Sequence, residues 1–234
     1  MRIEKKYLNF DGEIALFEEK PFTGFCVEHV DSIFCVEHFD SIGEQHYKVR
    51  SSLDVFGSEG NYKNGKKDGL WTYLYPEGQK RSEAHYRDGV ENGVTTCWYQ
   101  NGQQLSEKHY KDGVEDGATT YWNTNGGFSS EAHYKEGILM GPHINWHQNS
   151  QIKNKEHYKD GEREGLRVSW HDNGQKSTEV NYKDGKEDGL VIWWHEDGKK
   201  KGEKSFKDGK LDGLWTEWSE DGKKTYEKHF VDGK

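Results

Sequence analysis

Two columns of potential metal-binding side chains recur along the chain at intervals of 24 residues or multiples of it. Histidine occurs at His85, His109, His133, His157 and His229, and a glutamate column lies two residues earlier in the unit, at Glu83, Glu107, Glu131, Glu179, Glu203 and Glu227. A spacing of two on a β-strand places both side chains on one face. A metal needs several ligands within about 2–2.5 Å of one point, whereas equivalent positions of successive hairpins lie about 10 Å apart. The columns therefore predict surface Glu–His and Glu–Lys ladders.

Other chemistry-bearing residues are also interpreted as structural. Cys26/His29 and Cys35/His38 could suggest zinc or a nucleophile, but a spacing of three on a strand places the members of each pair on opposite faces. The Lys-Asp-Gly-x-x-Asp-Gly segments lack the D-x-D-x-D-G plus Glu pattern of a calcium loop, and their Asp and Gly suit turns. No phosphate-binding loop, Ser/His/Asp triad or paired-carboxylate site stands out. We predict a protein that is not an enzyme, with no cofactor and no metal.

Composition excludes several classes of protein. Hydrophobic residues make up 31% of the 234 residues and charged residues 32%, but 14% are aromatic, which favours a thin folded architecture over disorder. The net charge is −9, and residues 1–61 contribute −6 of it, from 6 Lys/Arg against 12 Asp/Glu. Such a chain lacks the basic surface of a nucleic-acid-binding protein. Its three cysteines form no disulfide framework. Without an apolar run or signal-peptide core, we predict a cytoplasmic protein with no membrane insertion.

A repeat of 24 residues organises most of the sequence. It is marked by an aromatic residue at Tyr62, Tyr86, Tyr110, Tyr134, Tyr158, Tyr182, Phe206 and Phe230. Glycines follow three and seven residues later, and a Trp usually follows after twelve. A third glycine, Gly78 in the first copy, recurs in every complete copy but one, where Ser150 replaces it. We therefore divide the chain into residues 1–61 and residues 62–234, the latter with seven copies and the start of an eighth.

Each unit is predicted to be a β-hairpin. Residues 70–75 (LWTYLY) and 79–86 (QKRSEAHY) are the strands, and the Pro-Glu-Gly, Gln-Asn-Gly and Asp-Asn-Gly segments are tight turns. We expect the Lys-Asp-Gly-x-x-Asp-Gly segment to cross to the next hairpin. A lone hairpin is marginally stable, so stacking is required. The predicted fold is all-β, an elongated solenoid-like array of hairpins forming a twisted antiparallel sheet.

Side-chain alternation assigns the two faces of this array. The face of Leu70, Thr72 and Leu74 is predicted to be the core, with a tryptophan column at Trp98, Trp122, Trp146, Trp170, Trp194 and Trp218. The other face varies between copies and is predicted to be exposed and partner-binding, through Trp71, Tyr73, Tyr75, Tyr99, Tyr121, His147, His171, Trp193 and His195. The alternative interpretation of these aromatic residues is cross-strand packing that supports a thin sheet.

The pattern YKDGxxDGLWxxWxxDGKKxxE resembles the MORN-repeat variant of the bacterial YwqK-like antitoxin family. The resemblance covers nearly all of 62–234 and, more loosely, residues 10–24, where Phe17 and Gly24 keep the aromatic-to-Gly spacing. It implies open arrays of β-hairpins that bind proteins or sometimes phospholipids, and an antitoxin or immunity role. It supplies no catalytic residues.

The N-terminal part departs from the repeat. Residues 25–33 (FCVEHVDSI) are followed at once by the near-copy 34–42 (FCVEHFDSI), which breaks the register of 24 and suggests short antiparallel strands. End units of a repeat array must shield the stack from edge pairing. We therefore predict an atypical, acidic N-terminal cap over 1–61, and its acidity suggests a place for a basic partner.

The leading functional hypothesis is a non-catalytic protein-binding module, an antitoxin or immunity-like protein that binds and occludes a partner protein such as a toxin. The first alternative is a carbohydrate- or choline-binding array, because DGLWTYLYPEGQK resembles aromatic hairpins that hold cations. The second alternative is a phospholipid-binding MORN scaffold, which the acidic charge disfavours. The open C-terminal edge of the sheet also suggests a homodimer through sheet edges.

Overall fold

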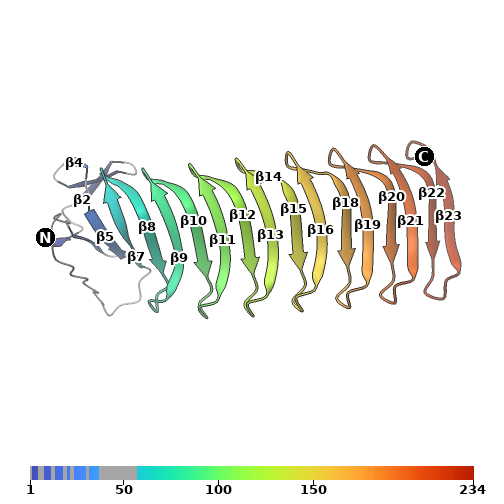
Figure 1. Ribbon diagram of the computed structural model, residues 1–234, viewed down its shortest axis with the longest axis horizontal. Helices are drawn as coiled ribbons and strands as arrows, with labels where there is room; N and C mark the ends of the chain where they lie inside the picture. Colours follow the sequence, from blue (N-terminus) through green and yellow to red (C-terminus); the bar gives the residue numbers. More distant parts are fainter. Residues whose placement is uncertain are drawn as a thin grey trace. The chain divides into compact units, whose positions relative to one another are not determined.

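The computed structural model describes residues 57–234 in full and, before them, the backbone of six short strands. The chain divides into two compact units, Met1–Val114 and Glu115–Lys234. Each unit is built of antiparallel strands that follow one another along the chain (Figure 1). No helix of the described residues is long and apolar enough to span a membrane.

Unit 1 contains a meander of five complete strands preceded by shorter ones. The meander consists of β7 (Gly57–Lys63), β8 (Lys66–Leu74), β9 (Lys80–Arg87), β10 (Val90–Trp98) and β11 (Gln104–Lys111), each antiparallel to the next. The earlier strands are β1 (Arg2–Glu4), β2 (Leu8–Asp11), β3 (Ile14–Phe17), β4 (Lys20–Pro21), β5 (Gly24–His29) and β6 (Ser32–Val36).

The described part of the tandem nonapeptide forms an antiparallel pair. In strands β5 and β6, Phe25 pairs with Val36 and Cys26 with Cys35, and β5 also pairs with β7. The expectation of short antiparallel strands is therefore confirmed for these backbone segments. The side chains of Cys26, His29, Cys35 and His38, and the rest of the predicted cap, lie outside the described residues.

Unit 2 continues the same pattern of antiparallel strands. It contains β12 (Val114–Trp122), whose first residue is the last of unit 1, followed by β13 (Phe128–Lys135), β14 (Ile138–Leu139), β15 (Gly141–Trp146), β16 (Ile152–Lys159), β17 (Glu162–Arg163), β18 (Gly165–Trp170), β19 (Lys176–Lys183), β20 (Lys186–Trp194), β21 (Lys200–Lys207), β22 (Lys210–Trp218) and β23 (Lys224–Phe230). The pairs β14–β15 and β17–β18 are each one repeat strand interrupted at the residue before its second glycine, since both members pair with the same neighbour.

Two kinds of turn connect the strands. The first shows that the segment expected to cross between hairpins is itself a hairpin turn. Asn64 and Gly65, with φ of 51° and 78°, form a two-residue turn between the paired residues Lys63 and Lys66. Two successive positive φ values define the type I′ turn, whose twist matches that of a hairpin. The first Asp-Gly of the repeat is thus a hairpin turn, and the second glycine makes a bulge within the next strand, as at Gly93, where φ is 125°.

The second kind of turn explains the single departure at Ser150. In other copies the third glycine has φ near 80°, as at Gly174 (81°), but Ser150 occupies the position with φ of 67°. A left-handed conformation costs an L-residue about 1–2 kcal/mol, offset in part by the extra freedom of glycine in the unfolded chain. We expect Ser150→Gly to stabilise unit 2 by about 0.5–1 kcal/mol in urea unfolding, whereas Ser150→Ala should bring no gain. A destabilised Ser150→Gly protein would contradict this account.

The face predicted as core is not the main buried face, although Thr72 and Thr216 on it are buried, at 8% and 2% exposed. We call the side of Trp71, Ala84 and their repeat equivalents the variable face, and the side of Leu70 the opposite face. Trp71 is 0% exposed and Ala84 2%, whereas Leu70 is 43% exposed. In unit 2 the same reversal holds: the buried residues Val180 and Val191 lie on the variable face, and the exposed ones on the opposite face are Leu166, Leu190 and Leu214.

Small residues opposite large ones cause this reversal. Trp71 is directly paired with Gly60, and a Cβ at Gly60 would lie 2.4–2.5 Å from ring atoms of Trp71. Trp71 also donates a hydrogen bond from Nε1 to the carbonyl oxygen of Asn61 (3.0 Å). The Trp71 ring therefore lies flat on the sheet, and side chains of the variable face pack against one another. Alternation alone gives two equivalent faces and cannot show which one does so.

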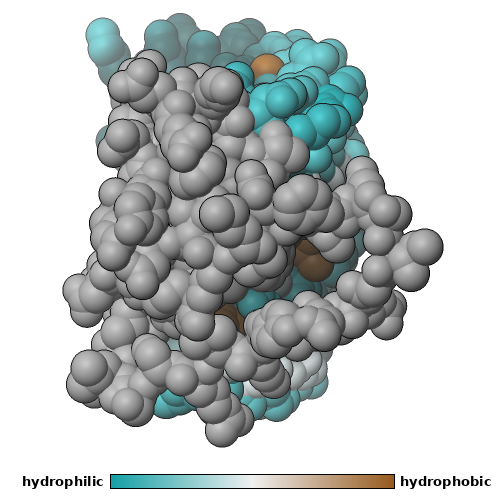
Figure 2. Space-filling model, turned by 90° about the vertical axis from the view of Figure 1, so that its left-hand side faces the viewer, coloured by the Kyte–Doolittle hydropathy of each residue, from teal (hydrophilic) through white to brown (hydrophobic). Residues whose placement is uncertain are grey.

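The tryptophan column predicted as core is half-buried. Trp98, Trp122, Trp146, Trp170, Trp194 and Trp218 are all of intermediate exposure. All six end their strands directly after a register shift, as between Cys97 and Trp98. Counting alternate residues from the start of the strand therefore fails at this column. The residues that are coloured in the view of Figure 2 are mostly hydrophilic.

Candidate functional site

One group of predicted site residues links neighbouring hairpins at the ends of their strands. In unit 2, Nε2 of His147, His171 and His195 lies 2.9, 3.1 and 3.2 Å from the carbonyl oxygens of Trp170, Trp194 and Trp218, respectively. In unit 1, the Tyr75 hydroxyl donates to the Trp98 carbonyl at 2.7 Å. Each contact joins residues 23 apart, and so connects one hairpin to the next. These four side chains therefore have a structural role that side-chain alternation did not reveal.

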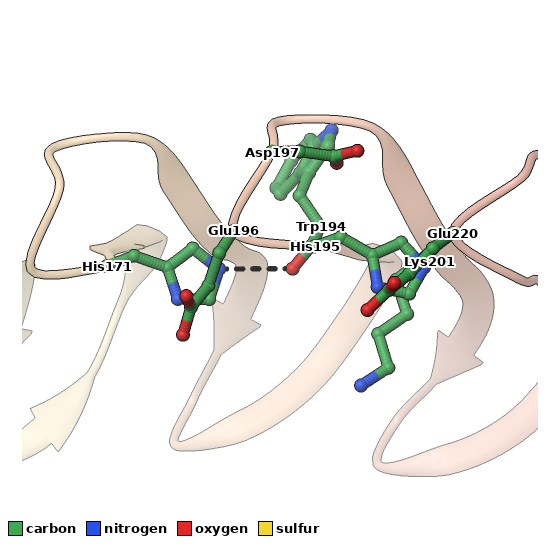
Figure 3. Close-up of a pocket in the computed structure, with 7 residues that line it drawn as sticks. All are labelled: His171, Trp194, His195, Glu196, Asp197, Lys201 and Glu220. Carbon is green, nitrogen blue, oxygen red and sulfur yellow. Dashed lines mark hydrogen bonds between the residues drawn. The ribbon is translucent and has the colours of Figure 1, made fainter.

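Figure 3 shows the depression beside two of these histidines. It is lined by His171, Trp194, His195, Glu196, Asp197, Lys201 and Glu220. The hydrogen bond from Lys199 holds the pKa of Asp197 below its usual value, so this carboxylate is occupied by its neighbour. Within the fully described residues, no group of three or more His, Cys, Asp or Glu side chains is placed to hold a metal ion.

The variable face of unit 1 contains an aromatic cluster around Lys67. Its Nζ lies 4.1 Å from the ring centroid of Trp71 and 3.0 Å from the Tyr73 hydroxyl. The hydroxyls of Tyr73 and Tyr86 are 3.1 Å apart, and the Tyr86 hydroxyl donates to Glu91 at 3.2 Å. Trp71 and Tyr73, both predicted as exposed recognition residues, thus lie in a packed network in which the chain's own lysine occupies the aromatic surface.

This network predicts a pH dependence at the alkaline end. Burial, followed by the hydrogen bond and charge of Tyr73 and Glu91, raises the pKa of Tyr86 above its ordinary value. A folded pKa above the unfolded one, about 10 for tyrosine, gives stability that is present below pH 10 and is lost as the pH rises further. We expect urea unfolding between about pH 8 and 11 to show a smaller loss of stability for Tyr86→Phe than for the wild type. Equal losses in the two proteins would contradict the prediction.

The variable face of unit 2 presents a continuous row of directly paired side chains. Each residue of the row is the register partner of the next: Tyr121, Ser130, Asn145, Asn154, Ser169, Thr178, Trp193, Gly202, Glu217 and Tyr226. The middle of the row is small and polar, and half-buried aromatic residues lie on both sides of it. Of the predicted recognition residues, Tyr121 and Trp193 belong to this row, and Tyr99 belongs to the turn after β10.

Four charged or titratable side chains form a cluster beside the polar part of this row. We call His143 (β15), Glu156 (β16), Arg163 (β17) and Arg167 (β18) the Glu156 cluster. The carboxylate of Glu156, 5% exposed, lies 2.8 Å from Nε of Arg163, 3.4 Å from Nε of Arg167 and 3.3 Å from Nδ1 of His143. The hydrogen bond to Glu156 raises the pKa of Arg163, so this guanidinium is charged at any physiological pH.

Sequence analysis missed all four residues of the Glu156 cluster, although a signal for them was present. The positions equivalent to Glu156 are apolar in three copies, at Ala84, Ala132 and Val180, and basic in three others, at Lys108, Lys204 and Lys228. The informative departure is a single carboxylate in a column that is otherwise small, apolar or basic.

The comparison with known families agrees with the repeat. The model described as MORN repeat variant matches residues 67–88, 91–112, 163–184, 187–208 and 211–232. The chain therefore contains MORN repeats, which confirms that part of the predicted resemblance. No curated protein matches the chain.

Proposed function

We propose that this MORN-repeat protein is a non-catalytic protein-binding module that uses the variable face of unit 2. The observation that carries the proposal is the row from Tyr121 to Tyr226, in which a regular backbone register presents a different side chain at almost every step. A repeated scaffold with varied side chains suits the recognition of an irregular protein surface. Half-buried Tyr and Trp beside polar side chains are typical of interface centres.

The resemblance to the YwqK-like antitoxin family supports a finer form of this proposal. In that form the chain is a bacterial, cytoplasmic antitoxin or immunity-like protein, and its partner is a toxin that it occludes. Occlusion needs only a large complementary surface and no catalytic residue. Inhibition of the captured partner's activity by the purified chain would test this form, and an unaffected activity would contradict it.

The contacts of two lysines weigh against the choline- or carbohydrate-binding alternative. Lys67 Nζ lies within 5.5 Å of the ring centroids of Trp71, Tyr73 and Tyr86. Lys204 Nζ lies 4.7 Å from the Phe206 ring and 5.7 Å from the Trp215 ring. An aromatic cage that already contacts an ammonium group of the chain has less surface for a ligand cation.

Affinity capture with paired variants tests the proposed face. The tagged chain is used to capture partners from a lysate of its source cells, alongside Trp193→Ser on the variable face and Leu190→Ser on the opposite face. We expect one stoichiometric partner that Trp193→Ser loses and Leu190→Ser retains, with both variants shown to be folded by circular dichroism. Loss with Leu190→Ser alone would assign binding to the opposite face, and the absence of any stoichiometric partner would contradict the proposed function.

A further inference from the structure

We propose that the Glu156 cluster, together with Ser169, is the specificity site of the variable face and binds an acidic side chain of the protein partner. This inference rests on the proposed function and adds the chemistry of the partner. A carboxylate is the expected ligand because two arginines share the single carboxylate of Glu156, and Ser169 lies two residues from Arg167 on the same strand.

The charges of the cluster do not balance. Arg163 and Arg167 both contact the same oxygen of Glu156, Oε2, at 2.8 and 3.4 Å. Two permanent positive charges thus share one carboxylate, which leaves a surplus of one. The chain as a whole has a net charge of −9, so this surplus is a local exception. A partner that places one negative charge here would complete the pairing.

The arginines are held in place before any ligand arrives. The Arg163 guanidinium lies between the rings of Tyr158 and Tyr182, 5.7 and 5.5 Å from their centroids. Glu156, which fixes the Nε of this arginine, is itself buried. Arg163 and Arg167 remain 43% and 30% exposed, so a partner can reach them. Such pre-ordering lowers the entropy that binding would otherwise cost.

Three buried atoms of the site make no hydrogen bond within the described residues. Nε of Arg167 and Nδ1 of His143 face Glu156 only at ion-pair distance, and Oγ of Ser169 has no hydrogen-bond partner there. The hydrogen bond from Arg163 to Glu156 uses Nε of the arginine. Its two Nη atoms therefore remain as donors for a second acceptor. An unsatisfied buried polar group costs about 1–3 kcal/mol. A partner's carboxylate, with two oxygens that accept from an arginine fork, would pair with the exposed parts of the Arg163 and Arg167 guanidinium groups.

A partner with one or a few carboxylates fits better than a polyanion. The fully described residues 57–234 carry more acidic than basic side chains, so an extended negative ligand would meet repulsion beyond the cluster. Beside the Glu156 cluster, the side chains of the polar part of the row are short: Ser130, Asn145, Asn154 and Ser169. They leave room for a partner side chain to approach the two guanidinium groups.

A random library of displayed 12-residue peptides tests the inference with the full chain. We expect selection on the wild type to enrich peptides with Asp or Glu at one fixed position. Arg163→Gln and Arg167→Gln should abolish this enrichment. Lys155→Gln should retain it, because Lys155 is an exposed lysine on the same strand as Glu156 but on the opposite face. A selected peptide should lose about tenfold or more in affinity when its acidic residue becomes the amide.

The outcomes separate the inference from the proposed function. Enriched peptides without a fixed acidic residue, or acidic enrichment that survives both arginine substitutions, would overturn the inference and leave the protein-binding proposal standing. The absence of any enriched peptide would count against both. The substitution of Glu or Asp by its amide in the peptide changes no residue of the protein, so this comparison remains valid even if an arginine variant fails to fold.

Discussion

Trp71→Ala is expected to destabilise unit 1 by about 3–5 kcal/mol, the usual cost of truncating a buried tryptophan. Trp71 is 0% exposed, and its ring packs edge-on against Tyr62 with ring centroids 5.1 Å apart. Nζ of Lys67 lies over the face of the Trp71 ring. Truncation removes both contacts and leaves the Asn61 carbonyl without its indole donor. Urea unfolding, with hydrogen exchange to report separately on unit 1, measures the effect.

The neighbouring residue on the same strand supplies the control for this prediction. Leu70 is 43% exposed on the opposite face, and Leu70→Ala should cost about 1 kcal/mol or less because little apolar surface is buried there. If the two substitutions had similar effects, the core would not lie on the variable face. The face assignment reached from side-chain alternation would then be correct after all.

Gly60→Ala is expected to cost about 3 kcal/mol, at the upper end for overpacking a core. The added Cβ would lie within 2.5 Å of three ring atoms of Trp71, a distance that real Cβ contacts do not show. Because Trp71 is fully buried, its ring has no open space into which it can move. The backbone of strand β7 or β8 must shift instead. The same unfolding experiment measures the effect.

A second glycine and a double mutant make this prediction specific. Gly202 meets Trp193 in the same way, with a Cβ distance of 2.2 Å, but Trp193 is half-exposed, so Gly202→Ala should cost only about 1 kcal/mol as the ring swings outward. Combining Gly60→Ala with Trp71→Leu should cost less than the sum of the two single changes by about 1 kcal/mol or more. Strict additivity would show that the clash with Trp71 is not the cause.

The two glycines also explain the internal variation of the repeat. Gly60 is the register partner of Trp71, and Gly202 is the register partner of Trp193. A large ring at one position is accommodated by the absence of a side chain directly across the strand pair. Positions that vary between copies therefore include paired adjustments of packing, and only part of the variation is available for recognition.

The sequence by itself determined the repeat, its period and the all-β fold. The 24-residue spacing of aromatic residues and glycines is visible without coordinates, and Asp-Gly pairs indicate hairpin turns because they adopt the positive φ that such turns require. The sequence could not show that each turn joins paired strands without a crossover. That result depends on the pairing of Lys63 with Lys66 and of its equivalents, which is a property of two strands together.

Only the tertiary structure decided which face is buried and where the candidate site lies. Alternation divides a strand into two sides but does not rank them, and bulges such as that at Gly93 change the count. His143, Glu156, Arg163 and Arg167 come from four strands and meet only when those strands are in register. A charge cluster is a property of distances between strands, and spacing along one strand does not contain those distances.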